Sequence, residues 1–194
     1  MNGLETLSGA LLAPEVAGAL EVRGTIAAAV LVPLYVRDGG LHAVFTERKH
    51  DLPRHAGEIS FPGGRRDPQD ASLVATALRE AQEEIGLNPD AVEILGALQP
   101  TSTIATGYSI YPFVGLISTA QSWAPNEREV AAIIELSLND VAAGYARRRL
   151  TRRGLEVRTD TYAVDGHVIW GATARIVDDL LDRIEFGTAT AQVS

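Results

Sequence analysis

A short acidic segment, residues 79–87, constrains the fold of this chain more than any other feature. It reads Arg-Glu-Ala-Gln-Glu-Glu-Ile-Gly-Leu. On a helix, Glu83 and Glu84 follow Glu80 at the i+3 and i+4 positions, so the three carboxylates crowd one face. Like charges at these spacings destabilise a helix by roughly 0.2–0.5 kcal/mol each. The pattern therefore predicts a helix whose carboxylates have a function, such as holding a metal ion that binds a polyphosphate.

An apolar stripe on the opposite face predicts that this helix docks on a core. The stripe recurs at i, i+4, i+7 and i+11, with Val74, Leu78, Ala81 and Ile85 as its members. Asp70 is the expected N-cap, and Gly86 is the expected left-handed residue after the last turn. We therefore expect a helix over residues 71–85, preceded by a short strand and glycine-rich loop over residues 59–64.

Composition and charge narrow the function classes. The chain has 194 residues, which fits a single domain over residues 1–194 with residues 1–23 as an N-terminal extension. Its 17 basic and 25 acidic side chains give a net charge of −8, so nucleic acid is not an expected partner. The longest apolar run, residues 26–36, is too short to span a bilayer, so we expect no membrane partner.

Cysteine usage and the N-terminal sequence bear on chemistry and location. Without cysteine the chain has no disulfide framework, no thiolate nucleophile and no cysteine-ligated zinc. No basic run precedes a hydrophobic stretch at the N-terminus, so a secretory signal is not expected. We therefore expect a cytoplasmic protein.

The rest of the chain predicts strands and helices in mixed order. Expected strands cover residues 25–36, 41–47, 92–98, 109–117, 130–136, 161–164 and 167–170. Turn signals at residues 38–40 and 165–166 predict two hairpins. Helices are expected from 137 to about 147 and over 173–184. This order predicts a mixed sheet between helices.

The acidic segment and the residues before it resemble the Nudix box. That pattern is Gly, five residues, Glu, seven residues, then Arg-Glu-apolar-x-Glu-Glu-x-Gly-apolar, and residues 79–87 match its second half. The first half is one residue longer here, so the first acid falls on Asp70 counted from Gly64 and on Ala71 counted back from Arg79. The resemblance implies the α/β class, with a Nudix-type α/β/α sandwich around a mixed β-sheet.

The lead-in Phe-Pro-Gly-Gly-Arg-Arg-Asp-Pro, residues 61–68, is similar to the coenzyme A pyrophosphatase branch of that family. An upstream signature of the branch matches in part: Arg48 is in register, whereas Pro53 replaces a usual arginine and Arg54 follows it. The resemblance implies a metal-dependent diphosphatase. It would cleave coenzyme A or its derivatives to adenosine 3′,5′-bisphosphate and 4′-phosphopantetheine.

The chemistry of a diphosphate suggests roles for the acidic residues. Its anionic oxygens repel a nucleophile, so catalysis requires charge neutralisation and a positioned water, both of which Mg²⁺ or Mn²⁺ supplies. Glu80 and Glu84 are the expected metal ligands, with Glu83 as a third ligand or shared between ions. The catalytic base is one of these glutamates or a carboxylate from elsewhere, for which Glu129 and Glu127 are candidates.

Basic residues and glycines complete the expected site. Arg79 is expected to orient a glutamate through a charge-assisted hydrogen bond. The expected substrate-binding residues are Arg48, Arg54, Gly63, Gly64, Arg65 and Arg66. An ordinary position on the solvated surface is the alternative for each of these four arginines.

Alternatives to the coenzyme A assignment stay open. One is hydrolysis of another nucleoside diphosphate derivative, such as ADP-ribose or a dinucleotide. Another is a non-catalytic nucleotide-binding regulator that kept the fold. A homodimer also stays open, because the leucines of the N-terminal extension cover either a partner or the protein's own core.

Overall fold

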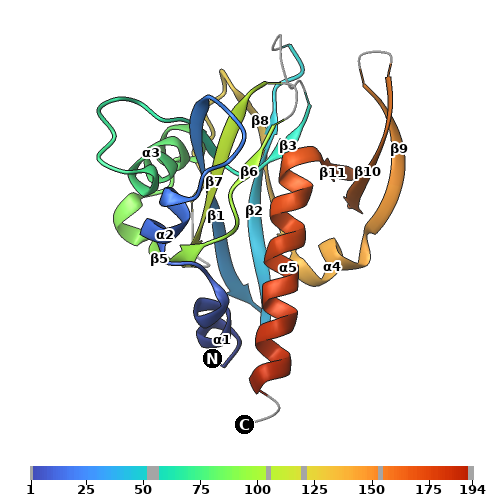
Figure 1. Cartoon of the computed structure of the whole chain (residues 1–194). Helices are drawn as coiled ribbons and strands as arrows, with labels where there is room; N and C mark the ends of the chain where they lie inside the picture. The colour runs from blue at the N-terminus through green and yellow to red at the C-terminus, as the bar shows by residue number, and fades with distance from the viewer. Residues whose placement is uncertain (1, 52–56, 104–105, 119–121, 153–154, 192–194) are drawn as a thin grey trace.

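The computed structural model describes residues 2–51, 57–103, 106–118, 122–152 and 155–191 (Figure 1). The helices are α1 (Asn2–Ala10), α2 (Pro14–Ala19), α3 (Leu73–Ile85), α4 (Leu138–Ala143) and α5 (Gly171–Ala191), with a 3₁₀ turn at Pro89–Ala91. The strands are β1 (Ile26–Arg37), β2 (Gly40–Arg48), β3 (Ile59–Ser60), β4 (Gly63–Arg65), β5 (Glu93–Ala97), β6 (Thr101–Ser102), β7 (Tyr108–Leu116), β8 (Val130–Ser137), β9 (Tyr145–Arg152), β10 (Leu155–Val164) and β11 (His167–Trp170).

Eight strands form a mixed sheet around β1. Its main path runs β3-β2-β1-β7-β5, while β4 pairs with β1, β6 with β7 and β8 with β2. Strand β1 is parallel to β7 and antiparallel to both β2 and β4. The pairing with β2 covers the end of β1, from Leu34 to Arg37, whereas β4 pairs with the earlier stretch from Ala28 to Val30. Because β2 and β4 share β1 in this way, β4 lies beside the middle of the sheet.

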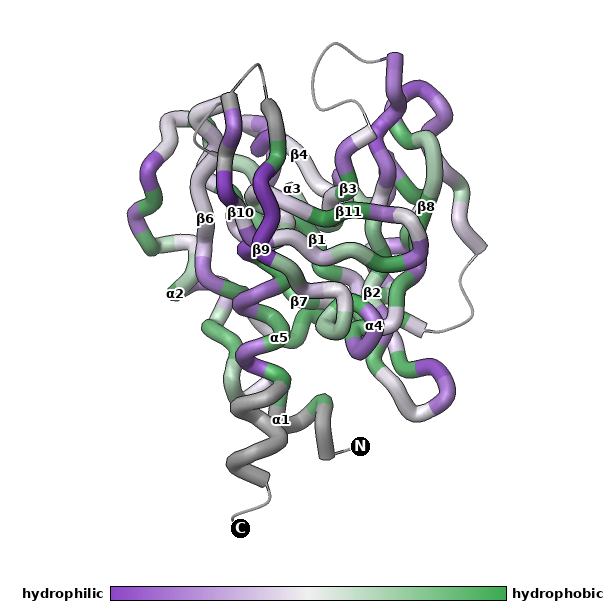
Figure 2. The backbone as a smooth tube through the Cα atoms, turned by 90° about the vertical axis from the view of Figure 1, so that its right-hand side faces the viewer, coloured by the Kyte–Doolittle hydropathy of each residue, from purple (hydrophilic) through white to green (hydrophobic). Residues whose placement is uncertain are grey.

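The central strand β1 is buried on both faces. Leu31 and Tyr35 join the core cluster that includes residues of α3, whereas Val32 and Leu34 join the cluster that includes residues of α5. Figure 2 shows hydrophobic colouring along much of β1, β2 and β7. A strand covered on both faces reads as a continuous apolar run, which accounts for residues 26–36.

Helices cover the two faces of this sheet. In Figure 1, α2 and α3 lie on one side and α5 on the other. Helix α1 runs beside α5, where Arg183 donates a hydrogen bond to the Ala10 carbonyl. Leu7 is only 1% exposed, so this part of the N-terminal extension covers the protein's own core. The predicted α/β/α sandwich is confirmed.

The predicted acidic helix exists, but it begins two residues later than expected. Helix α3 starts at Leu73, and its N-cap is Ser72, whose side chain accepts a hydrogen bond from the Ala75 N–H. The expectation that Asp70 caps the helix is wrong, because its carboxylate is engaged elsewhere. The C-terminal prediction is confirmed: Gly86 has φ 71°, in the left-handed region.

Both predicted hairpins are confirmed. The first turn places Asp38 and Gly39 at φ 53° and 77° between β1 and β2. The second places Asp165 and Gly166 at φ 51° and 81° between β10 and β11. The sequence Asp-Gly predicts a two-residue type I′ turn, and this turn requires positive φ at both central residues.

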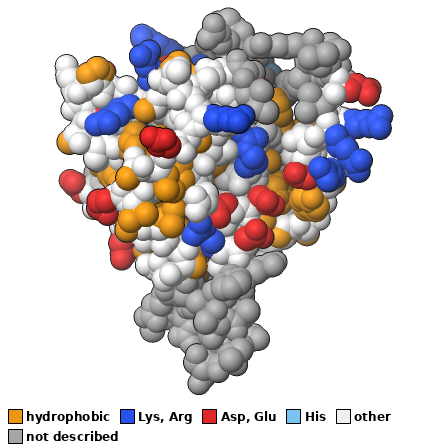
Figure 3. Space-filling view, in the orientation of Figure 1, with side chains coloured by type: hydrophobic (Ala, Val, Ile, Leu, Met, Phe, Trp, Pro, Cys, Tyr) orange, Lys and Arg blue, Asp and Glu red, His pale blue; other side chains and the backbone are white. Residues whose placement is uncertain are grey.

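The predicted helix from 137 to about 147 is wrong in its second half. Helix α4 ends at Ala143, and β9 then pairs with the long strand β10 to extend a second sheet in the order β11-β10-β9. Three successive exposed arginines, residues 147–149, lie on β9. Figure 3 shows basic side chains gathered at the edge where this hairpin lies in Figure 1.

In the described ranges, no helix is long and apolar enough to cross a bilayer.

Candidate active site

The acidic face of α3 rests against β4. The Gly63 backbone N–H donates a hydrogen bond of 3.1 Å to Glu84 Oε2. The adjacent Gly64 leaves space for Glu80, because a Cβ at Gly64 would lie 2.5 Å from the Glu80 carboxylate carbon. The sequence predicts a loop at these glycines, but the structure has a three-residue strand, since β4 pairs with β1. Two neighbouring glycines thus form a wall for two glutamates.

Glu80 and Glu84 occupy surroundings that disfavour negative charge. The pKa of Glu84 is raised to about 7, mainly by burial and to a smaller extent by the carboxylates of Glu80 and Glu129, although the hydrogen bond from the Gly63 N–H opposes the shift. Burial also raises the pKa of Glu80, although hydrogen bonding to Arg79 lowers it. Such carboxylates favour either a bound proton or a nearby cation.

Arg79 uses all five of its N–H groups. Its Nε and Nη2 donate to the two oxygens of Asp70 at 2.9 and 3.0 Å. Its Nη1 donates to Glu80 Oε1 at 2.9 Å and to Glu83 Oε2 at 3.2 Å. The remaining bond, of 3.2 Å, runs from Nη2 to the Arg65 carbonyl. Arg79 therefore fixes Glu80 relative to the segment that precedes the helix.

Asp70 anchors this arginine. Its Oδ2 also accepts hydrogen bonds from the Asp67 backbone N–H at 2.9 Å and from Thr76 Oγ1 at 2.8 Å. Hydrogen bonding to Arg79 holds the pKa of Asp70 well below its usual range, although burial opposes this. Ala71 has no polar side chain and is exposed. Of the two positions left open by the sequence, Asp70 is the one that contacts the arginine.

Glu83 lies at the outer edge of the acidic face. Its side chain is 57% exposed, compared with 17% for Glu80. The bond from Arg79 holds one of its oxygens. Glu83 is thus open to a ligand arriving from solvent, whereas Glu80 is held inside.

A loop far along the chain brings Glu129 to the same place. The Glu129 carboxylate contributes to the raised pKa of both Glu80 and Glu84. It also lies 3.6 Å from Arg48 Nη1, in an ion pair. Glu127 is exposed, and its carboxylate forms no ion pair with another described residue. Of the two candidate bases outside the helix, the structure therefore brings Glu129 to the acidic face.

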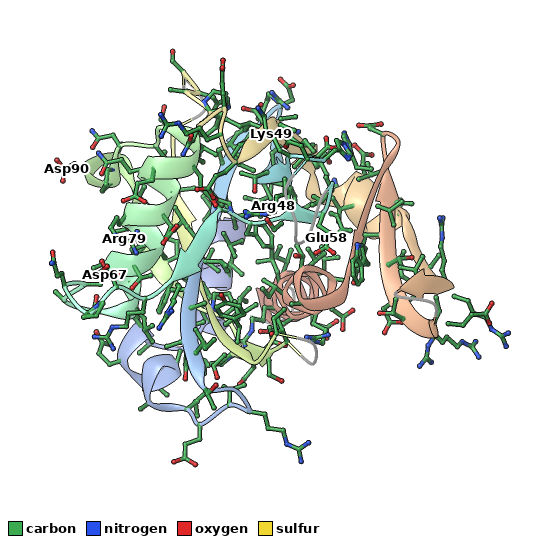
Figure 4. All side chains as sticks on the ribbon, turned by 90° about the horizontal axis from the view of Figure 1, so that it is seen from above. Arg48, Lys49, Glu58, Asp67, Arg79 and Asp90 are labelled. Atoms are coloured by element: carbon green, nitrogen blue, oxygen red, sulfur yellow. The ribbon has the colours of Figure 1, made fainter. Side chains whose placement is uncertain are left out.

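Three of the four expected substrate-binding arginines are described, and they lie on or next to the strands that border this site. Seen from above in Figure 4, Arg48 lies nearer the middle of the molecule and Arg79 on the α3 side. The positive charge of Arg48 lowers the pKa of Glu84, so Arg48 lies within electrostatic reach of the acidic face. Arg65 and Arg66, at and just after the end of β4, are exposed. Arg54 lies outside the described residues.

The donor set fits Mg²⁺ or Mn²⁺. Carboxylate oxygens are hard ligands, and a divalent cation between Glu80 and Glu84 would favour the charged form that burial disfavours at both residues. Within the described ranges, no three acidic or histidine side chains converge closely enough to hold a metal alone. Water and substrate oxygens would complete the shell, as is usual for Mg²⁺.

Three contributors to the site were missed from sequence. Trp123 and Asn126 lie on the loop that carries Glu129, and Glu135 on β8 accepts a hydrogen bond from Trp123. A turn signal at Pro125-Asn126 was the one available hint. The pairing of Trp123 with Glu135 depends on tertiary structure, and no local pattern marks it.

Comparisons with known proteins place the chain in a family. A family model described as the NUDIX domain matches residues 25–154. A Citrobacter koseri protein named "Uncharacterized Nudix hydrolase NudL" is 38% identical over 172 residues, which cover 88% of each chain.

Solved structures show the same fold. A MutT/nudix family protein from Enterococcus faecalis aligns with a TM-score of 0.59 at 14% identity, over 86% of this chain and 64% of that one. The NUDIX domain of Shewanella oneidensis NrtR, complexed with ADP ribose, aligns with a TM-score of 0.50 at 22% identity, over 62% of this chain and 78% of that one. With the matched sequence and the acidic helix on β4, the chain belongs to the Nudix hydrolases, enzymes that act on phosphoric anhydrides of nucleoside diphosphate derivatives and generally use divalent metal ions.

Proposed function

We propose that this Nudix hydrolase cleaves the pyrophosphate bond of coenzyme A or its derivatives, with Mg²⁺ or Mn²⁺ as the metal. The products are adenosine 3′,5′-bisphosphate and 4′-phosphopantetheine. The observation that carries the chemistry is the pair of partly buried glutamates, Glu80 and Glu84, held against the glycines of β4. The similarity of residues 61–68 to the coenzyme A pyrophosphatase branch supports the substrate class.

Each acidic residue has a proposed role. Glu80 and Glu84 hold the metal, and Glu83 adds a ligand from the exposed edge. A bound divalent cation supplies charge neutralisation for the phosphoryl oxygens and acidifies water. Glu129 is the proposed base. It comes from a separate segment, whereas Glu80, Glu83 and Glu84 lie on one face of α3 and are the proposed metal ligands. Arg79 acts through Glu80, whose orientation it fixes.

The basic residues at the rim are proposed to hold the substrate. Guanidinium groups bind phosphate oxygens in a bidentate manner. Arg48 is placed to meet the diphosphate, because it lies within reach of Glu84 and Glu129. Arg65 and Arg66 present exposed charge beside β4, and together with Arg54 they would bind the other phosphates of coenzyme A.

A hydrolysis assay with a panel of substrates tests this proposal. Coenzyme A, ADP-ribose, NADH and diadenosine polyphosphates are each incubated with Mg²⁺ or Mn²⁺, and the products are identified by mass spectrometry. We expect 4′-phosphopantetheine to be released faster than any product from the other substrates. Preferential turnover of another substrate would keep the Nudix chemistry and reject coenzyme A.

ADP-ribose is the second candidate. The NUDIX domain of NrtR, with the TM-score of 0.50 given above, is complexed with ADP ribose. If ADP-ribose is hydrolysed best, this alternative replaces coenzyme A. If no substrate turns over with either metal while one of them binds, the chain acts as a nucleotide-binding regulator.

A further inference from the structure

The loop before β8, residues 122–129, connects three parts of the protein. It touches the end of α3, the sheet strand β8 and the end of β2, and it carries Glu129. A loop can hold a functional carboxylate only as firmly as its own contacts hold the loop. The contacts of this loop therefore decide where Glu129 lies.

The loop caps the C-terminal end of α3. The backbone N–H of Ala124 donates to the Ile85 carbonyl at 3.0 Å, and that of Asn126 donates to the Glu84 carbonyl at 2.9 Å. Carbonyls in the last turn of a helix lack partners within the helix, so these bonds satisfy two of them. One of the two belongs to a proposed metal ligand. The loop and the acidic face are thereby joined through the backbone.

Asn126 then organises the turn that ends at Glu129. Its carbonyl accepts hydrogen bonds from the backbone N–H groups of Glu129 and Val130, both at 2.9 Å. Its side-chain Oδ1 accepts from the Arg128 N–H at 3.2 Å. The position of Glu129 is thus set by a turn whose first residue is bonded to α3.

One side chain ties this loop to the sheet. Trp123 Nε1 donates to Glu135 Oε1 at 2.6 Å, and the Trp123 ring packs on the core cluster beneath α3. Glu135 is held in turn by Tyr35, whose hydroxyl donates to Oε2 at 2.8 Å, and by Arg37 Nη1 at 3.1 Å. A fixed, charged acceptor makes the bond from Trp123 a strong one.

We propose that Trp123 is a positioning residue of the catalytic site, which acts by clamping the loop to Glu135 so that Glu129 stays beside Glu80 and Glu84. The inference rests on the proposed function, because it assigns Glu129 a part in turnover. Trp123 itself touches no reacting atom. Its effect is on the rate of the chemical step, with little effect on substrate affinity.

Two matched variants separate this role from plain stability. Trp123→Phe keeps an aromatic ring in the core but removes the donor to Glu135. Tyr35→Phe removes another donor to the same carboxylate, from a strand that does not carry the loop. We expect Trp123→Phe to lower kcat about tenfold with KM within about twofold, whereas Tyr35→Phe keeps kcat within about twofold, because Arg37 still holds Glu135 and the bond from Trp123 remains. Equal loss of kcat in both variants would overturn the proposal.

A double-variant measurement tests the route through Glu129. In a Glu129→Gln background, Trp123→Phe is expected to lower kcat by less than twofold, because the residue that it positions is already removed. A full tenfold loss in that background would show that Trp123 acts otherwise and would overturn the proposal. Melting temperatures of all four proteins, measured in parallel, identify any loss caused by unfolding.

Failure of the proposed function gives a different result. If Glu129→Gln alone leaves kcat unchanged, Glu129 is not part of the reaction and the inference falls with that assignment. If Trp123→Phe does not fold, Glu135→Gln replaces it, since it keeps the shape of the acceptor but removes its charge. That variant is expected to lower kcat about threefold in the wild-type background and not in the Glu129→Gln background; the absence of this difference would overturn the proposal.

Discussion

Asp70 and Glu84 are both partly or largely buried carboxylates near α3, but their surroundings differ. The comparison separates a carboxylate with a structural role from one with a proposed chemical role. Asp70 is only 7% exposed, yet four hydrogen bonds satisfy it, and its pKa lies below the usual range. Among the described residues, Gly63 alone donates a hydrogen bond to the Glu84 carboxylate, whose pKa is raised to about 7. The surroundings of Asp70 stabilise its negative charge, whereas the surroundings of Glu84 disfavour a negative charge. The raised pKa of Glu84 supports the proposal that this carboxylate binds a cation.

The largest expected effect concerns Glu84 in turnover. Glu84→Gln preserves shape but removes a proposed metal ligand, so we expect kcat to fall about a thousandfold, equivalent to about 4 kcal/mol in the barrier. Steady-state kinetics at saturating Mn²⁺ measures this. Glu93→Gln removes an exposed carboxylate on β5 and is the matched control. Near-normal activity of Glu84→Gln would mean that Glu84 does not hold the metal.

Asp70 should matter chiefly for stability. Asp70→Asn removes the partner that binds Arg79 through two oxygens, in a partly buried position, and leaves Arg79 with Glu80 and Glu83 alone, so we expect a loss of about 3 kcal/mol in the free energy of unfolding near pH 7. Because folding lowers the pKa of Asp70, its stabilising effect is present above the unfolded value of about 3.9 and is lost as the pH falls below it.

Urea unfolding at pH 7, 5 and 3.5 measures this difference between wild type and Asp70→Asn. The difference should be largest at pH 7 and should shrink at pH 3.5. A constant difference across the three values would show that the carboxylate charge is not what stabilises Arg79.

Glu84 should show the opposite sign in the metal-free protein. Its folded pKa of about 7 lies above the unfolded value of about 4.3, so the folded state binds more protons between these values and loses stability as the pH rises through them. Glu84→Gln is therefore expected to be about 2 kcal/mol more stable than wild type at pH 8 and no more stable at pH 4. Unfolding in urea with EDTA measures this difference.

Added Mn²⁺ completes that test. A bound cation favours the charged carboxylate, so saturating Mn²⁺ should stabilise the wild type at pH 8 and reverse the advantage of Glu84→Gln. If Glu84→Gln remains more stable than the wild type at pH 8 with Mn²⁺ present, Glu84 does not bind the metal.

The comparison of sequence with structure shows which parts of the site are locally encoded. The acidic face of α3, its apolar stripe and the left-handed Gly86 are set within one helix, so periodicity and turn chemistry predict them. The two hairpin turns are local in the same sense. The strand β1 was also predictable, because its burial on both faces gives a continuous apolar run.

The parts that depend on tertiary pairing were not predictable. Strand β9 carries polar side chains on both faces, so it lacks the alternation that marks a strand, and its first residues were assigned to a helix. Arg79 recruits Asp70 across nine residues, which removes that carboxylate from its expected place as the N-cap. The loop with Trp123 and Glu129 contacts α3 through hydrogen bonds between segments far apart in the sequence, which no local pattern encodes.

The smallest expected effect tests that reassignment of the N-cap. Ser72 Oγ accepts the Ala75 N–H at 3.1 Å, so Ser72→Ala should cost about 1 kcal/mol in the free energy of unfolding. Unlike Asp70→Asn, it leaves Arg79 and the carboxylates in place, so the cost should not vary with pH between 4 and 8, and kcat should stay within twofold. Urea unfolding and kinetics on the same preparation measure both. A loss of kcat greater than twofold in Ser72→Ala would mean that the capping bond at the start of α3 also determines where the glutamates lie, because the capping bond and the ion pair between Asp70 and Arg79 anchor the same helix through separate atoms.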